Sequence, residues 1–377
     1  MIRLPHFEGH PHFFIAEDVM DLGLFMMPLH PPSRPLADTL DEDLELLVAA
    51  DHLGYQEAWI GEHQTLAWEP IVAPEIFIGK ALALTRRIRL GPGVVLLQQH
   101  HPAYVANRIA LLDHLARGRL NFGIGVGGIP TDHELLDLDS LRGDHQAMWQ
   151  EAIEMVLKLW TAEAPFDFQG KYWRVGIRNP RVKIGLGVLP RPYQKPHPPI
   201  GVAGVTARSL SHRYAGERGW YPMSINFAAP PTLRAHWANY EDGARAAGRR
   251  PNRKLWRIAR DIFVGDTAKE ARAHALNGSM ARGFREWLLP QYELAPERMA
   301  VFKINPKMSN RDITVEYLVD NVWIVGDPAE CVRKLRKLHD EVGGFGVLLA
   351  VAHDWDDKAR WLRSMDLLAK EVIPRLP

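Results

Sequence analysis

The sequence predicts an α/β fold in which eight strand–helix units form a (β/α)₈ TIM barrel, with a long insertion near the seventh strand. Three observations lead to this prediction. Short β-branched and apolar runs alternate with helical patterns, polar residues follow directly after the runs, and no linker or shift in composition divides the 377 residues. Strands that alternate with helices pair in parallel. A doubly wound sheet fits the same order, and both folds place chemistry at the carboxyl ends of the strands.

The first expected strand, residues 21–30, precedes a helix that the capping box Thr39–Glu42 should begin and Gly54 should end. The third strand lies within RIRLGPGVVLLQQHHP, residues 87–102, where Gly93 in mid-strand indicates a bend, a bulge or a close neighbour. The other expected strands are residues 57–62, 119–126, 199–205, 220–225, 254–264 and 345–352. The other expected helices are residues 74–84, 102–115, 146–160, 232–248, 327–342 and 358–372, together with one that begins at 209.

Residues 275–320 are rich in Met, Arg and aromatic side chains and show no regular pattern. Because this stretch is longer than an ordinary connection, we expect an irregular lid over the site. Trp287, Tyr292 and Met308 are its candidate contacts with an apolar substrate. We interpret residues 1–377 as a single domain that includes this lid.

The composition excludes several classes of function. Lys and Arg total 46 against 45 Asp and Glu, so the chain shows no charge excess for nucleic acid or an anionic membrane. No apolar run approaches the roughly 18 residues of a membrane span, and the first twenty residues lack the pattern of a signal peptide. We expect a cytoplasmic protein. The single cysteine, Cys331, excludes an internal disulfide and should be a buried, inert thiol.

Polar side chains follow the expected strands and should meet at one mouth of the barrel. His63 directly follows the buried-type run EAWIGE, and an imidazole that is neutral near pH 7 can accept or donate a proton. We therefore take His63 as the candidate catalytic residue; the alternative is a histidine that only shapes the pocket. Five further side chains are expected to line a substrate pocket: His30, Glu62, His101, Asn226 and His353.

Residues Gly123–Gly128 match the dinucleotide fingerprint GxGxxG. They follow the fourth strand instead of the first, and Pro130 interrupts the helix that should come next. We interpret Gly125, Gly127 and Gly128 as backbone that lets a flat ring lie close to the strand ends.

The segment Gly204–Ser209 passes from the fifth strand into the N-terminus of a helix. Free backbone N–H groups and the helix dipole favour an anion there, and one phosphate is the natural guest. Ordinary capping of the helix by Ser209 is the alternative. The expected cofactor-binding residues here are Thr206, Ala207, Arg208 and Ser209, with Ser224 at the end of the sixth strand.

A metal site is the alternative interpretation of the histidines. His10-Pro11-His12 is similar to the HxH motif of barrel metallohydrolases, and other histidines could complete a site. This motif precedes the first strand, which would place it at the wrong end of the barrel or outside it. We expect no metal.

Four long motifs together resemble the bacterial-luciferase-like flavin monooxygenases, and especially their limonene 1,2-monooxygenase branch. They are EAWIGEH, RIRLGPGVVLLQQHHP, LLDHLARGRLNFGIGVGGIP and GGFGVLLAVAHDW, and the resemblance covers about residues 22–374. It implies a (β/α)₈ barrel that holds reduced FMN, which a separate flavin reductase supplies. The bound flavin would react with O₂ to give a C4a-peroxyflavin that oxygenates an apolar substrate. We also expect a homodimer.

Transferred to this chain, the resemblance implies a cis peptide bond at Gly93–Val94 against the flavin ring, with Gly125–Gly128 beneath the ring. His63 matches the family's active-site histidine, and Thr206–Ser209 match its phosphate loop.

This chain differs from some family members at two positions expected to lie near the phosphate. Some members have arginines where this chain has Val126 and Gln146. The phosphate charge would then be neutralised by Arg142, His145 or Arg208.

The sequence therefore predicts a two-component monooxygenase that acts on a small apolar compound such as a terpene or cyclic ketone. Epoxidation, hydroxylation and Baeyer–Villiger insertion all fit these residues. The alternatives are a deazaflavin-dependent hydride-transfer enzyme on the same barrel, a metal-dependent hydrolase, and a flavin-binding protein without turnover.

Overall fold

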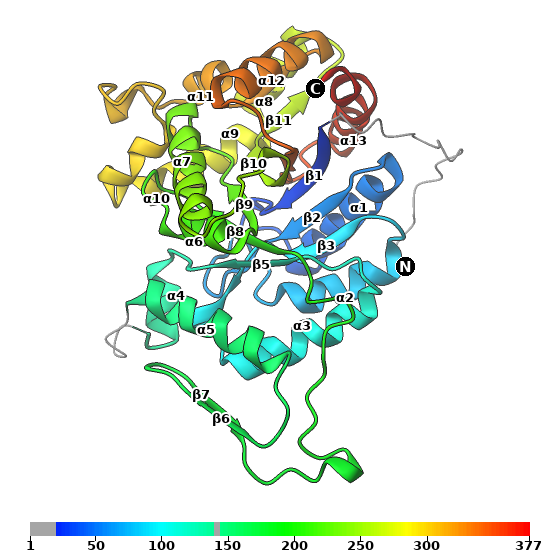
Figure 1. Ribbon diagram of the computed structural model, residues 1–377. Helices are drawn as coiled ribbons and strands as arrows, with labels where there is room; N and C mark the ends of the chain where they lie inside the picture. Colours follow the sequence, from blue (N-terminus) through cyan, green and yellow to red (C-terminus); the bar gives the residue numbers. More distant parts are fainter. Residues whose placement is uncertain (1–19, 139–143) are drawn as a thin grey trace.

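The chain folds into a barrel of parallel strands surrounded by helices (Figure 1). The structure is a computed structural model that describes residues 20–138 and 144–377. In this part of the chain, nine strand segments pair in the order β3-β2-β1-β13-β10-β9-β8-β5-β4, and β3 and β4 belong to the same third strand. The predicted (β/α)₈ class is therefore confirmed. The segments are β1 Asp21–Met26, β2 Glu57–Ile60, β3 Arg89–Pro92, β4 Val95–Leu96, β5 Phe122–Gly125, β8 Ile200–Gly204, β9 Tyr221–Ser224, β10 Arg257–Arg260 and β13 Val347–Val351.

The third strand is divided by the cis peptide bond between Gly93 and Val94, where the resemblance placed it. Before this bond, β3 pairs with β2, and Leu90 forms a parallel bridge with Leu120. After it, β4 pairs with β5, with Val95 opposite Ile124. The two segments thus connect β2 to β5 and close the ring of strands.

The inside of the barrel is filled by Trp59, which has no exposed surface. Its indole packs with the apolar inner residues of the other strands: Phe25, Met223, Ala259, Val347, Leu349 and Val351. Two glycines leave it room, because a Cβ at Gly93 would lie 2.6 Å from Trp59 Cβ, and one at Gly201 would lie 2.8 Å from Trp59 Cη2. A Cβ at Gly123 would lie 2.1 Å from the Pro92 carbonyl oxygen, so this glycine allows the close approach of β5 to β3. Gly93 is therefore required by a side chain of the barrel itself.

A buried ion pair lies beside the indole. Trp59 Nε1 donates to Glu57 Oε1 at 2.8 Å, and Arg257 donates through Nε and Nη2 to the two oxygens of Glu57, both at 3.1 Å. A buried charge is tolerated when its partner and hydrogen bonds are complete. This pair links β2 to β10 across the barrel interior.

The helices surround the barrel largely as expected, with one corrected start. The first helix begins at Leu36 with Pro35 before it, and the Thr39 hydroxyl bonds back to the Leu36 carbonyl at 2.9 Å. The predicted capping box at Thr39 is therefore wrong, while Gly54 ends the helix at φ +86° as expected. The helices are α1 Leu36–Leu53, α2 Pro74–Leu84, α3 Pro102–Ala116, α4 Pro130–Leu135, α5 His145–Leu159, α6 Leu210–Arg218, α7 Pro230–Ala246, α8 Ala268–Asn277, α9 Ser279–Gly283, α10 Leu289–Glu293, α11 Val315–Asn321, α12 Pro328–Val342 and α13 Lys358–Leu367.

Helices α6 and α7 approach each other unusually closely. A Cβ on Gly216 would lie 2.0 Å from the Tyr240 carbonyl oxygen, and one on Gly243 would lie 1.9 Å from that of Arg213. Because both residues are glycines, the backbones of α6 and α7 touch, and α7 packs against the helix that follows the fifth strand.

The insertion follows the seventh strand, as predicted, but it is not irregular. Helices α8 to α11 and a π-helical turn at Phe284–Leu288 form most of it. Two short strands, β11 Ile262–Val264 and β12 Ile324–Gly326, pair in parallel at its base. The mixed Met, Arg and aromatic composition concealed helices that are too short to show a periodic pattern.

Two further features complete the fold. A hairpin, β6 Phe166–Gln169 with β7 Arg174–Ile177, extends away from the barrel (Figure 1). Cys331 is buried in α12, and burial raises the pKa of its thiol to about 12, as an inert thiol requires. In the described part of the chain, no helix combines the length and apolar character needed to cross a membrane.

We expect Gly93→Ala to lower the free energy of unfolding by roughly 1–3 kcal/mol, because the new methyl group would overlap Trp59. Gly79→Ala is the matched control: it lies within α2, and a Cβ there meets nothing within 4 Å. Better helix propensity should raise the stability of the control by up to about 1 kcal/mol. Chemical denaturation measures both changes, and equal effects in the two variants would contradict the packing explanation.

Candidate functional site

A cavity of about 490 Å³ lies at the carboxyl ends of the barrel strands, between the barrel and the inserted helices. Its wall combines strand residues such as Phe25 and Val351 with Met280, Trp287 and Tyr292 of the insertion. Met308 does not line it. Most of the sequence-predicted residues do: Glu62, His63, Gly93, Val94, Gly125, Gly127, Gly128, Thr206, Arg208, Ser209, Asn226 and His353. The cavity is thus the place where the predicted site residues come together.

His63 lies in the wall of the cavity between two carboxylates. Its Nε2 is 3.3 Å from Glu69 Oε2, and its Nδ1 is 3.8 Å from Asp132 Oδ2. Burial alone would lower the pKa of His63, but the charge of Glu69 and the contact with Asp132 raise it to about 9. The expectation of a ring that is neutral near pH 7 is therefore replaced by an imidazolium, which can only donate.

Both carboxylates next to His63 were missed by the sequence analysis. Asp132 is the third residue of α4, a helix too short to show a pattern, and its Oδ1 accepts from the Thr65 backbone N–H at 2.8 Å. Glu69 lies in the loop after β2. Their acidic character was the only available signal, because loop residues meet His63 only through tertiary structure.

Glu62 lines the cavity, but both oxygens of its carboxylate accept hydrogen bonds from other groups of the protein. Its Oε1 accepts from His100 Nε2 at 2.6 Å, and its Oε2 accepts from the Leu96 backbone N–H at 3.0 Å. Glu62 therefore ties the end of the second strand to the end of the third.

The glycines at the third and fourth strands have different neighbours. A Cβ on Gly125 would lie 2.5 Å from Val94 Cγ2, so this glycine makes room for the protein's own side chain. Gly127 has φ +73° and lies against Leu96. A Cβ on Gly128 would meet nothing within 4 Å, so its backbone borders open space in the cavity. Of the three glycines, Gly128 alone leaves backbone facing an empty space.

The loop after the fifth strand ends in a helix N-terminus that faces the cavity. Ser209 caps α6, because its Oγ accepts from the His212 backbone N–H at 3.2 Å. Thr206, Arg208 and Ser209 line the cavity, whereas Ala207 does not: its carbonyl accepts from Asn239 Nδ2 at 2.9 Å. Ser209 thus performs the ordinary capping role, and the backbone N–H groups before it remain beside the cavity.

A chain of hydrogen bonds holds the loop between β8 and α6 in place. Trp256 Nε1 donates to Ser224 Oγ at 2.9 Å, and Ser224 Oγ lies 3.0 Å from His236 Nδ1. His236 Nε2 lies 3.0 Å from the Thr206 carbonyl oxygen, to which it can only donate. Burial lowers the pKa of His236 to about 4, so the ring is neutral and carries its proton on Nε2. Ser224 therefore lies behind the loop and does not line the cavity as a cofactor contact.

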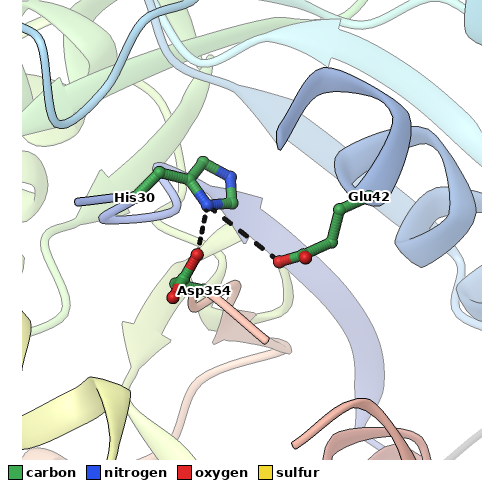
Figure 2. Close-up of side chains that lie close together, drawn as sticks. All are labelled: His30, Glu42 and Asp354. Carbon is green, nitrogen blue, oxygen red and sulfur yellow. Dashed lines mark hydrogen bonds and ion pairs between the residues drawn. The ribbon is translucent and has the colours of Figure 1, made fainter. Parts of the chain in front are cut away.

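His30 lies outside the cavity, in a buried cluster of charges (Figure 2). Its Nδ1 is 2.7 Å from Asp354 Oδ1 and 4.0 Å from Glu42 Oε1, and its Nε2 is 3.2 Å from Asp43 Oδ1. Burial alone would lower the pKa of His30, but hydrogen bonds to Asp354 and Asp43 raise it to about 9. The predicted substrate contact is instead a charged structural group, because neighbouring carboxylates take both ring nitrogens.

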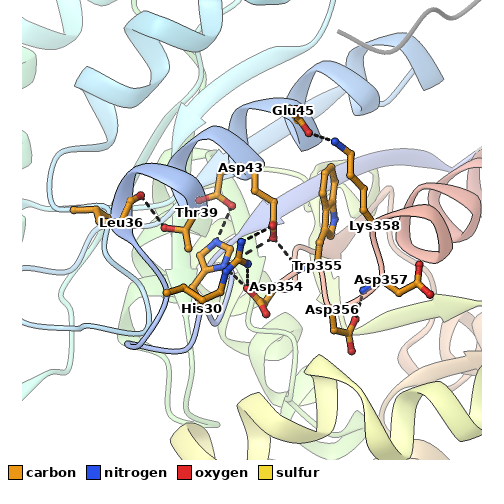
Figure 3. A network of polar contacts seen from close by, with 12 residues as sticks. His30, Leu36, Thr39, Asp43, Glu45, Asp354, Trp355, Asp356, Asp357 and Lys358 are labelled. Carbon is orange, nitrogen blue, oxygen red and sulfur yellow. Dashed lines mark hydrogen bonds and ion pairs between the residues drawn. The ribbon is translucent and has the colours of Figure 1, made fainter. Parts of the chain in front are cut away.

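The same carboxylates could suit a metal ion by their spacing, but arginines hold them. Arg34 bonds to Glu42 at 2.9 Å and to Asp354, and Arg282 of α9 bonds to the other oxygen of Asp354. Glu42 Oε1 accepts from the Trp355 backbone N–H at 2.7 Å. Figure 3 shows His30, Asp43, Asp354 and Trp355 in this network. With His30 protonated, the cations of this cluster balance its carboxylates: His30, Arg34 and Arg282 against Glu42, Asp43 and Asp354. Arg282 also connects the insertion to the barrel. His10-Pro11-His12 lies outside the described residues.

His101 is also outside the cavity. It is the residue before α3, its Nδ1 accepts from the Ala103 backbone N–H at 3.3 Å, and its ring meets the rings of Tyr104 and Trp173 edge to face. The expectation that His101 lines the pocket fails because the third strand ends at Leu96 and a 3₁₀ turn then carries the chain away.

Fold and site together define an α/β-barrel protein with a largely apolar cavity at the carboxyl ends of its strands, bordered by a helix N-terminus. Residues 20–343 match the luciferase-like monooxygenase family, and the chain belongs to it.

Two curated relatives are similar over nearly the whole chain. The 2,5-diketocamphane 1,2-monooxygenase 1 of Pseudomonas putida is 32% identical, over 95% of this chain and 99% of that protein. The limonene 1,2-monooxygenase of Rhodococcus erythropolis is 30% identical, over 94% of this chain and 86% of that protein. A solved structure, the oxygenating constituent of 3,6-diketocamphane monooxygenase from a Pseudomonas putida plasmid, is a type II Baeyer–Villiger monooxygenase in complex with FMN. It has a TM-score of 0.88 and 32% identity, over 95% of this chain and 99% of that one.

The charged His30 cluster should make stability depend on pH. His30→Gln removes a cation from among carboxylates, and we expect it to lower the free energy of unfolding by roughly 3–5 kcal/mol at pH 6. Because the folded-state pKa is raised to about 9, the effect is complete below about 6.5 and shrinks as the pH rises through about 9.

Denaturation curves at pH 6, 7.5 and 9 measure this difference, with His114→Gln on the exposed side of α3 as the control. The control should stay close to the wild type at every pH. A His30→Gln effect that is constant from pH 6 to 9 would show that the ring is not charged in the folded protein.

Proposed function

We propose that this chain is the oxygenase component of a two-component flavin monooxygenase that uses reduced FMN and O₂ to oxygenate a small apolar compound. One observation carries the proposal: a single cavity joins an anion-binding helix N-terminus, open glycine backbone and the cationic His63 beneath an apolar lid. When bound, the reduced flavin supplies the electrons that activate O₂. The FMN named for the similar Pseudomonas structure supports this choice of cofactor.

The residues fit the parts of FMN. The N–H groups of Thr206 to Ser209 and the guanidinium of Arg208 would hold the phosphate at the start of α6. Gln146 also lines the cavity, and its buried Nε2 has no hydrogen-bond partner among the described residues. This amide is a second phosphate ligand and takes the place of the arginine found in some family members. Arg142, another candidate, lies outside the described residues.

The protein's own part in the reaction is to position the flavin ring, to exclude water and to supply the positive charge of His63. Gly128 lets a flat ring lie against backbone, and the apolar side chains of Trp287 and Tyr292 exclude water from the reacting oxygen. His63 lines the cavity as a cation, and its Nδ1 lies 3.8 Å from Asp132 Oδ2 without a hydrogen bond to a described residue. Its positive charge would stabilise negative charge that develops on oxygen bound in the cavity. Glu69 and Asp132 keep the ring protonated near pH 7.

The partners follow from this function. A separate flavin reductase would deliver the reduced FMN, and the relatives' names, diketocamphane and limonene monooxygenases, support a small apolar substrate. A homodimer is supported by large exposed apolar side chains on the neighbouring helices α2 and α3: Ile76, Tyr104, Leu111 and Leu115. The cytoplasmic location and the single-domain organisation stay predictions.

Anaerobic titration of the purified protein tests the function directly. We expect reduced FMN to bind with a micromolar or lower Kd and a reduced deazaflavin to bind much more weakly; flavin absorbance and fluorescence report both. Addition of O₂ and a terpene or ketone panel to the FMN complex should then give oxygenated product. Binding of the deazaflavin alone, or an activity that a chelator abolishes, would reject the proposal.

His63→Gln should leave the affinity for reduced FMN unchanged but speed the release of hydrogen peroxide after mixing with O₂ by about tenfold or more. A charged donor stabilises developing negative charge better than a neutral amide does. The difference should fade as the pH rises through about 9, because the wild-type ring then loses its proton. Stopped-flow oxidation with a peroxide assay measures the rate, and His101→Gln is the control outside the cavity. Equal rates in wild type and His63→Gln at pH 7 would leave His63 a pocket-shaping role only.

A further inference from the structure

A second polar cluster lines the same cavity on the side away from His63. Asn226 follows β9, Asp261 follows β10, and His353 follows β13. The ring order places β9 four positions from β2 in either direction, so this cluster lies across the barrel mouth from His63. Asp261 was not anticipated from the sequence, because it separates two segments, β10 and β11, that had been expected to form one strand.

The amide of Asn226 has a defined orientation. Its Nδ2 lies 2.8 Å from Asp261 Oδ2, and a carboxylate can only accept a hydrogen bond. The NH₂ end of the amide must therefore point at Asp261. One of its two N–H groups is used there, the other has no acceptor among the described residues, and the residue lines the cavity.

Asp261 is itself held in place from two sides. Its Oδ1 lies 3.0 Å from His353 Nε2, and its backbone carbonyl accepts from the Ile324 N–H at 2.9 Å. His353 is only 4% exposed and stacks on Trp361, and neither of its ring nitrogens forms a hydrogen bond among the described residues. The buried His353 ring thus lies next to one oxygen of the carboxylate, while the Asn226 amide bonds to the other oxygen.

The loop that carries Asn226 is fixed by a buried arginine. Arg260 donates to the backbone oxygens of Asn226 at 2.7 Å and Ala228 at 2.8 Å. Burial lowers the pKa of Arg260 to about 10, which leaves it charged near pH 7 and able to balance Asp261. The position and the orientation of the Asn226 amide are therefore both set before any ligand arrives.

The surroundings of this amide are apolar. Ile225, Phe227 and Phe284 line the neighbouring wall of the cavity. A few placed polar groups in an apolar pocket decide how a ligand is oriented, and a donor left unpaired there costs free energy. An unpaired N–H beside a carboxylate suits a neutral oxygen acceptor and disfavours an anion.

We propose that Asn226, oriented by Asp261, donates a hydrogen bond to a neutral oxygen of the substrate, and that the cavity thereby prefers a ketone to the hydrocarbon of the same shape. This inference rests on the proposed function, since it names the chemistry of the substrate in the same cavity. Asn226 is a specificity-determining contact, and Asp261 is a positioning residue that acts through it.

Matched ligand pairs test the hydrogen bond separately from shape. Norcamphor and 2-methylenenorbornane differ only in a carbonyl oxygen replaced by CH₂, as do cyclohexanone and methylenecyclohexane. Calorimetric titration of the anaerobic protein with reduced FMN gives the ratio of their affinities. We expect each ketone to bind about tenfold more tightly than its partner in the wild type, and both ratios to fall to about one in Asn226→Leu.

Two variants complete the design. Asp261→Asn keeps the size of the side chain but can donate as well as accept, so the Asn226 amide loses its fixed orientation and the ratios should also fall. Gln291→Leu removes another amide from the cavity wall without touching the cluster, and it should keep the wild-type ratios.

The outcomes separate this inference from the function on which it rests. The Kd for reduced FMN, measured in every variant, reports on the proposed function and should stay constant. The inference would be overturned by ketone-to-hydrocarbon affinity ratios near one in the wild type, by unchanged ratios in Asn226→Leu, or by an equal fall of the ratios in Gln291→Leu. A failure of the wild type to bind reduced FMN would overturn the proposed function.

Discussion

The packing of Trp59 inside the barrel is the constraint on which the site depends. An indole of this size occupies the interior, so the third and fifth strands present Gly93 and Gly201 where they pass it. The cavity that holds the site lies beyond the indole, at the carboxyl ends of the strands. The strand that carries Trp59 continues directly into His63, so the same packing that closes the barrel also positions the candidate catalytic group.

Burial alone does not decide the charge of the buried histidines. His30 and His63 are held as cations because carboxylates contact both ring nitrogens, and these contacts outweigh the cost of desolvation. Burial lowers the pKa of His212 and His236, which have backbone and hydroxyl partners, so both stay neutral. His63 is thus a cation in the wall of the cavity, His30 is a cation within the cluster of Asp43 and Asp354, and the neutral ring of His236 supports the loop between β8 and α6.

Several elements could be predicted because their signals are local in sequence. Apolar runs followed by polar residues marked all eight barrel strands, and Gly54 marked the end of the first helix. The insertion was located but mistaken for irregular structure, since helices of five to seven residues, such as Ser279–Gly283 and Val315–Asn321, are too short to display a period. Glu69, Asp132 and Asp261 gave no local signal beyond their acidic character.

The sequence by itself determined the order of strands and helices, the family motifs and the set of polar residues that end the strands, because these depend on neighbours along the chain. Only the tertiary structure decided which of these residues share the cavity. His63 and Asn226 face it, whereas His30, His101 and Ser224, with equally suggestive positions, turn to partners elsewhere in the fold. The reason is physical: a buried polar side chain goes where its charge and hydrogen bonds are satisfied, and those partners come from elements far apart in sequence.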